Sequence, residues 1–330
     1  MNDRANIKHI AKCQANASAK SKDQQHTTQS KLFAAYFLLP QHTKKLKLMK
    51  DLFSDIQDDK RTSVGKSKVD YKVASSILTK ASGFMETYDF TLNPYSGCSF
   101  GCTYCYAAFF SRTEEQRSNW GHWLTVKENA LQLLIKFRKK PLHDKTIYMS
   151  SVTDPYQPIE RELKLTRSLL RELADFHQPR LVIQTRSPIV SRDIDLFKQF
   201  KAIQVNMTIT TDSENVRRVF EPLCPSNASR MKAIKEVNDA GVNTCITLTP
   251  LLPIEDAESF ALSLKETGIK KFIVQPFHSD RGKFIAGTGE AAMNLIKQMN
   301  WTNEKYKQVE SILIKHIPEI GIGKEGFKPI

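Results

Sequence analysis

Long hydrophobic runs are missing from this 330-residue sequence. The longest apolar stretch, residues 32–39, is far shorter than the roughly 18–20 residues that a membrane-spanning helix needs. The N-terminus is polar and lysine-rich and has no apolar segment typical of a secretory signal. Cysteine is also scarce, because six cysteines are too few for a disulfide scaffold in a chain of 37.6 kDa. We therefore expect a cytoplasmic protein that does not enter a membrane.

Acidic residues are too few to balance the basic ones, and the formal net charge is +14. The first 80 residues contain 16 Lys and Arg but only 7 Asp and Glu, so they carry about nine of the surplus charges. We expect residues 1–80 to form a basic leader, with a disordered arm over 1–30 and a short helix within 31–57. Three roles remain open for it: a solvated leader, an arm that binds nucleic acid, or an organelle transit peptide.

Beyond about residue 84, short β-type runs alternate with segments of helical period. This alternation is typical of parallel β–α–β units. The predicted strands cover residues 89–93, 146–152, 180–185, 202–210, 243–250 and 271–275. The predicted helices cover residues 159–176, a segment that starts behind an N-cap at Ser226, residues 257–264, and a C-terminal extension with helices at 291–299 and 302–317.

Two of the predicted strands have one polar face. Within residues 203–210 and again within 242–249, apolar side chains alternate with Gln, Asn, Thr and Cys. A parallel strand covered on both faces is normally apolar on both. The pattern favours an open or partial barrel whose concave face holds a polar ligand over a closed, filled barrel. The alternative is an antiparallel sheet with one face exposed to solvent. The predicted helices between the strands argue against it.

Three cysteines, Cys98, Cys102 and Cys105, lie on a loop directly after the first predicted strand of this region. Structural zinc usually takes four protein ligands in two halves, and the remaining cysteines of the sequence are isolated from one another. Three thiolates on a [4Fe–4S] cluster would leave one iron without a protein ligand. The spacing therefore favours such a cluster, with a zinc site or a chance arrangement as the alternatives.

The residues around the cysteines carry further motifs in a consistent order. They are Asn-Pro-Tyr-Ser-Gly-Cys at 93–98, Tyr-Cys-Tyr-Ala at 104–107, Ser-Val-Thr-Asp-Pro-Tyr-Gln-Pro-Ile-Glu at 151–160, Thr-Arg-Ser at 185–187, and Glu-Pro at 221–222 followed by Pro-Ser at 225–226 and Arg230. With these motifs the sequence resembles the radical S-adenosylmethionine (SAM) superfamily. More narrowly, it resembles the branch related to spore photoproduct lyase and the DNA repair photolyase-like proteins.

The resemblance implies an α/β fold, a partial (β/α)6 TIM-like barrel over residues 81–285, followed by the helical extension 286–330. It implies that the three cysteines bind a [4Fe–4S] cluster, which reductively cleaves SAM to a 5′-deoxyadenosyl radical that abstracts hydrogen from a substrate. The residues that match SAM-contacting positions are Tyr104, Ser151, Thr153, Arg186 and Thr208.

The candidates for catalysis are less well defined. They are Asp154, Tyr156 and Cys245. Spore photoproduct lyase has a hydrogen-donor cysteine at the position that Ser151 occupies here, and a serine O–H bond is too strong to quench a carbon radical. Thymine-dimer reversal by that route is therefore in doubt. Glu160 fits a helix cap as well as a ligand-binding role.

The leading hypothesis is a radical SAM enzyme with an unassigned substrate, for which nucleic acid is a candidate, and with an electron donor such as flavodoxin or ferredoxin. A dual-cluster enzyme would need a further cysteine trio, which the sequence lacks. The alternative from another class is a non-catalytic iron–sulfur or zinc protein that binds nucleic acid, which the positive charge would suit.

Overall fold

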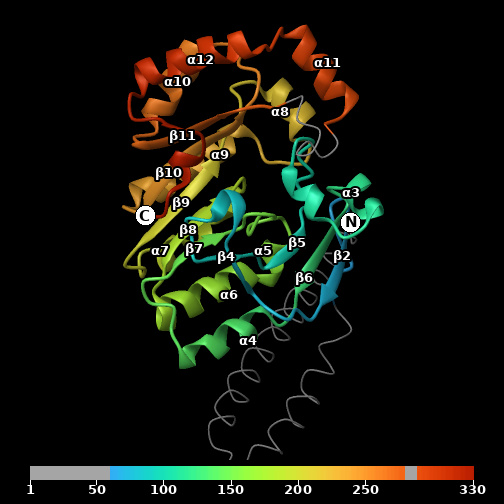
Figure 1. Ribbon diagram of the computed structural model, residues 1–330, viewed down its shortest axis with the longest axis vertical. Coiled ribbons are helices and arrows are strands. Elements are labelled where there is room, and N and C mark those ends of the chain that lie inside the picture. Colours follow the sequence, from blue (N-terminus) through green and yellow to red (C-terminus); the bar gives the residue numbers. More distant parts are fainter. Residues whose placement is uncertain (1–59, 279–287) are drawn as a thin grey trace, which may run out of the picture. The chain divides into compact units, whose positions relative to one another are not determined.

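The structure is a computed structural model that describes residues 60–278 and 288–330 (Figure 1). The chain divides into two units, residues 1–60 and 61–330, and the description below concerns the second. The arm and the helix that the sequence predicts within residues 1–57 lie outside the described residues.

The larger of two sheets has eight strands in the order β12-β11-β10-β9-β8-β7-β4-β3. Its six central strands are parallel neighbours: β4 (Phe90–Leu92), β7 (Thr146–Met149), β8 (Arg180–Thr185), β9 (Ile203–Thr208), β10 (Asn243–Leu251) and β11 (Lys271–Pro276). At the edges, β12 (Gly321–Ile322) is parallel to β11, and β3 (Leu78–Lys80) is antiparallel to β4. The predicted α/β fold with a parallel sheet is confirmed, and the antiparallel alternative is wrong.

Helices connect the parallel strands, and most of them pack on the large core at one face of the sheet. They are α4 (Ala130–Ile135), α5 (Glu160–Leu163), α6 (Leu165–Glu172), α7 (Ile194–Phe197), α8 (Glu214–Phe220), α9 (Asn227–Asp239) and α10 (Ala257–Glu266). Ser226 caps α9 as the sequence predicts, since its hydroxyl accepts the backbone N–H of Ser229. The extension adds α11 (Glu290–Gln298) and α12 (Asn303–His316), and α12 packs beside α10 (Figure 1).

The single helix predicted over residues 159–176 is interrupted in the structure. Lys164 adopts a left-handed conformation with φ of 50° between α5 and α6, and a π-helical turn, Leu173–His177, follows α6. The buried Glu160 carboxylate accepts the backbone N–H groups of Thr166 and Arg167 at the start of α6. Glu160 therefore caps a second helix, which the helical period of the sequence alone does not reveal.

A smaller sheet in the order β1-β2-β6-β5 adjoins the cysteine loop. It contains β1 (Ser63–Val64), β2 (Ser67–Lys72), β5 (Tyr95–Gly97) and β6 (Trp123–Lys127), and the short helix α3 (Glu114–Ser118) precedes β6. Strands β1, β2 and β3 all lie within residues 61–80, so the leader boundary expected at residue 80 falls inside the folded unit.

The two faces of the parallel strands differ as their alternation predicts. The apolar face of β9, with Val205 and Met207, belongs to the large core that the helices cover. On the opposite face, Gln184 donates to Thr208 at 2.7 Å and to Thr247 at 3.0 Å, so these polar groups bond to one another.

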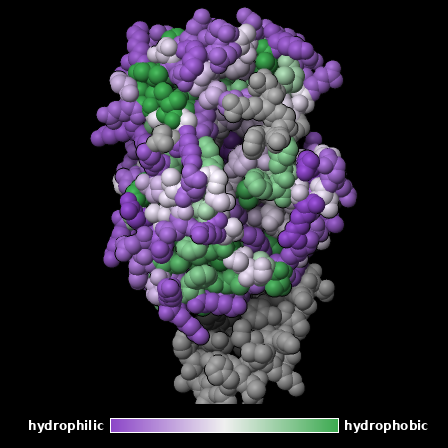
Figure 2. Space-filling model, in the orientation of Figure 1, coloured by the Kyte–Doolittle hydropathy of each residue, from purple (hydrophilic) through white to green (hydrophobic). Residues whose placement is uncertain are grey.

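One part of the polar face is closed by apolar side chains. Met85 and Tyr88 come from the chain before β4, and Phe327 comes from the C-terminal 3-10 turn. They pack on Tyr148, Val182, Cys245 and Ile273 of the strands. On the face that Figure 2 shows, apolar groups lie in separate patches among polar ones. No helix of the described segments has the length and apolar character to cross a bilayer.

The carboxylate of Glu160 gives a test of the fold. It bonds to Tyr95 of β5 and forms an ion pair with Arg192 at 2.9 Å, and its side chain is fully buried. Because Glu160→Gln leaves Arg192 without this partner, we expect the free energy of unfolding to fall by about 3 kcal/mol. The matched control is Asp239→Asn, whose ion pair with Lys235 is half exposed and should change stability by less than about 0.5 kcal/mol. Denaturant unfolding measures both, and equal losses would contradict the role of Glu160.

Candidate active site

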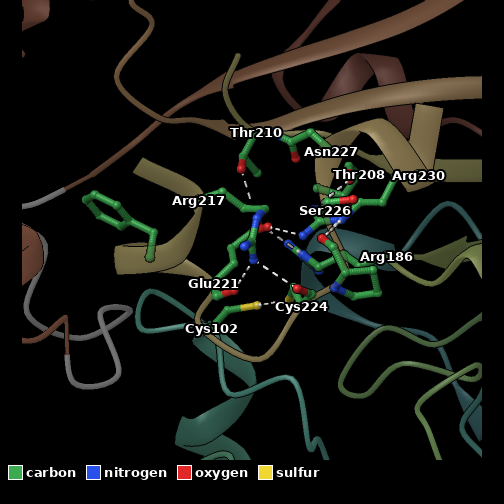
Figure 3. A network of polar contacts seen from close by, with 12 residues as sticks. Cys102, Arg186, Thr208, Thr210, Arg217, Glu221, Cys224, Ser226, Asn227 and Arg230 are labelled. Carbon is green, nitrogen blue, oxygen red and sulfur yellow. Dashed lines mark hydrogen bonds and ion pairs between the residues drawn. The ribbon is translucent and has the colours of Figure 1, made fainter. Parts of the chain in front are cut away.

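The carboxyl ends of the parallel strands meet at one edge of the sheet, where α/β folds usually bind ligands. The cysteine loop, residues 93–105, follows β4, Arg186 follows β8, and Thr210 follows β9. The loop after α8, residues 221–226, joins them there (Figure 3). The structure thus brings together segments that are more than 100 residues apart in the sequence.

Two glycines shape the cysteine loop. Gly97 and Gly101 have φ of 74° and 54°, which side chains with a Cβ atom rarely adopt. A Cβ on Gly97 would lie 2.6 Å from the carbonyl oxygen of Trp123, and a Cβ on Gly101 would lie 2.9 Å from the Cα of Gly121. The loop therefore packs backbone to backbone against the segment that leads into β6.

Neighbouring side chains hold the same loop by hydrogen bonds. The hydroxyl of Thr153 donates to the carbonyl of Gly97 at 2.6 Å, and the side-chain oxygen of Gln157 accepts the backbone N–H of Ser99 at 2.9 Å. Thr153, a residue that matches a SAM-contacting position, thus bonds to the loop that carries the cysteines.

The three thiols are close enough to affect one another's ionisation. Burial raises the pKa of Cys98, and the charges of Asp154, Cys102 and Cys105 raise it further. Burial and the charge of Cys102 raise the pKa of Cys105 to about 12. A hydrogen bond with Cys224 lowers the pKa of Cys102, and the charge of Arg186 lowers it further. Burial raises the pKa of Cys102, but the net change is downward. Three thiolates in this setting need a positively charged group to hold them together.

The donor set fits a [4Fe–4S] cluster. Cys98 and Cys102 are buried, Cys105 is partly exposed, and all three are free thiols on one loop. Within the described residues, no three His, Cys, Asp or Glu side chains converge on a point that could hold a single metal ion. A cubane cluster takes each thiolate on a different iron, so it does not require such convergence, and thiolate is its usual protein ligand.

A buried ion network lies beside the cysteine loop (Figure 3). The Glu221 carboxylate is fully buried, pairs with Arg230 at 2.6 Å, and accepts hydrogen bonds from Thr210 at 3.1 Å and from the hydroxyl of Tyr104. Arg186 lies 3.5 Å from Glu221 and donates to the Tyr104 oxygen at 3.1 Å. Burial alone would raise the pKa of Glu221, but the charges of Arg230 and Arg186 lower it to about 2, so the carboxylate is ionised near neutral pH.

The other two residues that match SAM-contacting positions also lie at the strand ends. Thr208 forms the hydrogen bonds to Gln184 and Thr247 on the polar face of the sheet, and its carbonyl accepts from Arg230 at 3.2 Å. Ser151 follows β7, and its carbonyl accepts from the hydroxyl of Tyr106, the residue after the third cysteine.

The three candidates for catalysis have different surroundings. Asp154 is buried and accepts the backbone N–H groups of Tyr156 and Arg186 and the hydroxyl of Thr185, so it fixes the end of β8. Tyr156 is fully buried within the large core. Cys245 packs with the apolar group that closes part of the polar face, and its thiol contacts the Ile246 carbonyl at 3.7 Å. Only Asp154 touches the network that contains Arg186.

Sequence reasoning did not place Cys224 in this region. It treats Cys224 as isolated, but the structure places its Sγ atom 3.6 Å from the Sγ atom of Cys102 (Figure 3). The backbone N–H of Thr103 bonds to the carbonyl of Phe220 at 2.9 Å, and this bond joins the two loops. The available signal was the position of Cys224 between Glu221 and Arg230, inside a motif already singled out. Cys13 lies outside the described residues.

Comparisons with known proteins agree with this geometry. The family model of the radical SAM superfamily matches residues 92–266. An uncharacterized protein of Methanocaldococcus jannaschii is 39% identical over 164 residues, which are 50% of this chain and 61% of that protein. The chain therefore spans about three fifths of that relative. An uncharacterized protein of Acidianus two-tailed virus is 25% identical over 246 residues, 69% of this chain and 78% of that protein.

Solved structures of spore photoproduct lyase variants share the fold. One variant has a TM-score of 0.54 at 16% identity and covers 84% of this chain and 93% of its own. Another, with bound AdoMet and dinucleoside spore photoproduct, has a TM-score of 0.53 at 15% identity and the same coverage. At these identities the likeness concerns the fold alone.

The contact between Gly101 and Gly121 yields a prediction. A Cβ on Gly121 would lie 2.7 Å from the Cα of Gly101, at a φ of 94°. We expect Gly121→Ala to displace the cysteine loop and to lower the iron bound after anaerobic reconstitution. The control is Gly241→Ala, which has a similar φ of 82° but no neighbouring atom within 4 Å, and which should bind iron like the wild type. Equal iron contents in the two folded variants would contradict this account of the loop.

Proposed function

Because the chain belongs to the radical SAM superfamily, we propose that it is an enzyme that cleaves SAM reductively at a [4Fe–4S] cluster held by Cys98, Cys102 and Cys105. The observation that carries the proposal is that the cysteine loop and the Arg186 network meet at one edge of the sheet, within the segment that the family model matches. When bound, the reduced cluster supplies one electron to SAM, and the 5′-deoxyadenosyl radical so formed takes a hydrogen atom from the substrate.

The ion network contains more guanidinium groups than carboxylates. Two guanidinium groups, Arg186 and Arg230, face the single carboxylate of Glu221, so the three groups together have a net charge of one positive unit. Arg230 is fully buried, whereas the Arg186 side chain is 21% exposed. We assign Arg186 to the carboxylate of SAM, because a guanidinium group can bind a carboxylate through two hydrogen bonds.

Aromatic side chains beside Arg186 suit the adenine of SAM. The ring of Tyr104 lies 6.4 Å from that of Phe220 and 6.5 Å from that of Phe277, and Arg186 lies over the Tyr104 ring at 5.8 Å. Such a wall excludes water from a reactive radical and offers a stacking surface. Ser151, Thr153 and Thr208 are assigned to the remaining polar contacts with SAM.

The substrate remains unassigned within this proposal. The positive net charge makes nucleic acid the leading class, and a ferredoxin or flavodoxin is the class of electron donor that the reaction requires. Ser151 has no thiol, so this chain does not supply a hydrogen atom to a substrate radical from that position.

Formation of 5′-deoxyadenosine tests the proposed reaction. Anaerobically reconstituted, dithionite-reduced protein should convert SAM to methionine and 5′-deoxyadenosine, as measured by chromatography. Replacing Cys98, Cys102 or Cys105 with Ala should reduce the product to the level seen without dithionite, because each removes a cluster ligand. A protein that binds the cluster but never cleaves SAM would favour the non-catalytic alternative, and a colourless protein with one zinc would refute the cluster.

The role of Arg186 has its own test. Arg186→Lys keeps the charge but loses the two-fold hydrogen bonding, and we expect the affinity for SAM to fall about tenfold or more. Arg218→Lys, an exposed substitution on α8, is the control and should leave the affinity unchanged. Equilibrium dialysis with the reconstituted protein measures both. Equal dissociation constants for Arg186→Lys and the wild type would exclude this contact.

A further inference from the structure

Cys224, a buried thiol from a different part of the chain, lies against the cysteine loop. The Sγ atom of Cys224 is 3.6 Å from the Sγ atom of Cys102, within hydrogen-bonding distance for two sulfur atoms. Cys224 is 7% exposed and shares one small buried cluster with Cys98, Phe100 and Cys102. The spacing of the three cluster cysteines does not include it.

The loop that carries Cys224 is held firmly in place. Arg217 donates from one nitrogen to the carbonyls of Glu221 and Cys224, at 3.0 and 2.9 Å. Arg230 donates to the carbonyl of Pro225 at 3.0 Å, and the backbone N–H of Cys224 bonds to the carbonyl of Glu221 at 3.1 Å. Buried guanidinium groups thus fix the backbone on both sides of this thiol.

We propose that Cys224 donates an S–H···S hydrogen bond to the iron-bound thiolate of Cys102 and so raises the reduction potential of the cluster. This inference rests on the cluster assigned under the proposed function. A thiolate bound to iron can only accept a hydrogen bond, whereas a cysteine thiol that binds no metal can donate one. Hydrogen bonds to cluster sulfur atoms stabilise the reduced, more negative state and are among the factors that set the potential.

A thiol is a weak hydrogen-bond donor in water, but the surroundings of Cys224 strengthen the hydrogen bond that it donates. Both sulfur atoms are buried, and an acceptor that bears charge strengthens the bond in a medium of low dielectric constant. Cys224 is therefore a positioning and tuning residue of the cluster, and it needs no contact with SAM or substrate.

Potentiometric titration followed by electron paramagnetic resonance tests this role. In Cys224→Ala we expect a more negative midpoint potential, so that the ratio of reduced to oxidised cluster at a fixed solution potential falls about threefold to tenfold. A tenfold fall corresponds to about 59 mV for a one-electron couple. Cys224→Ser keeps an O–H donor and should recover most of the wild-type potential, which a purely structural role of the side chain would not predict.

Cys245→Ala is the matched control, because it also removes a buried thiol but one that packs with Tyr88 and Tyr148. Its midpoint potential should equal that of the wild type. An unchanged potential in Cys224→Ala, or an equal shift in Cys245→Ala, would overturn the inference while leaving SAM cleavage intact. Loss of SAM cleavage by wild-type protein with a full cluster would instead refute the proposed function.

The cluster-free protein provides a second readout. Diamide takes two electrons and two protons from a pair of thiols, which become a disulfide, and is itself reduced to the hydrazine. Peptide mass spectrometry should then find Cys102 joined to Cys224, and the bound cluster should prevent this product. Failure to form the Cys102–Cys224 disulfide, with other pairs formed instead, would contradict the proximity on which the inference depends.

The titration also separates tuning from ligation. If Cys224 were a fourth ligand of the cluster, no iron would be open to SAM in the wild type. SAM would then leave the electron paramagnetic resonance spectrum of the wild type unchanged and would alter that of Cys224→Ala. That result would overturn both the tuning role and the open iron site.

Discussion

A single buried carboxylate, Glu221, is the constraint on which the candidate site depends. An ionised carboxyl group without a counter-charge costs several kcal/mol in a protein interior. Arg230 and Arg186 supply that charge, and Tyr104 and Thr210 supply hydrogen bonds. Because these residues come from the α8–α9 loop, helix α9, the end of β8, the cysteine loop and the end of β9, one ion network sets their relative positions. Tyr104 on the cysteine loop and the arginine assigned to SAM are thereby oriented before any ligand binds.

Local pattern predicted much of the sheet and little of what lies around it. Strand β8 was predicted over its full length, because a run of β-type residues between turn signals needs no long-range information. Strands within residues 61–80 were missed, since they are short and polar. The longest of them, β2, also pairs with β6, about 55 residues further on. The break at Lys164 was missed because no Gly or Pro marks it, and the group that starts the second helix is the buried carboxylate of Glu160.

In the candidate site, too, local pattern predicted the residues of one loop but not the long-range contacts between loops. Spacing alone predicted that Cys98, Cys102 and Cys105 share one loop, but it could not predict that Cys224 packs against them. Likewise, the sequence could not separate structural from reactive carboxylates, because that depends on which donors surround each one. Asp154 is used by the backbone and hydroxyl groups that shape the end of β8, and its contribution is to place Arg186 rather than to leave a free carboxylate.

The central claim is that three thiolates leave one iron open for SAM. Mössbauer spectroscopy of the 57Fe-reconstituted protein, recorded with and without SAM, tests it most directly. The account predicts that SAM changes the signal of one iron site out of four and leaves the other three unchanged. Identical spectra with and without SAM at a saturating concentration, from a protein with a complete cluster, would contradict it.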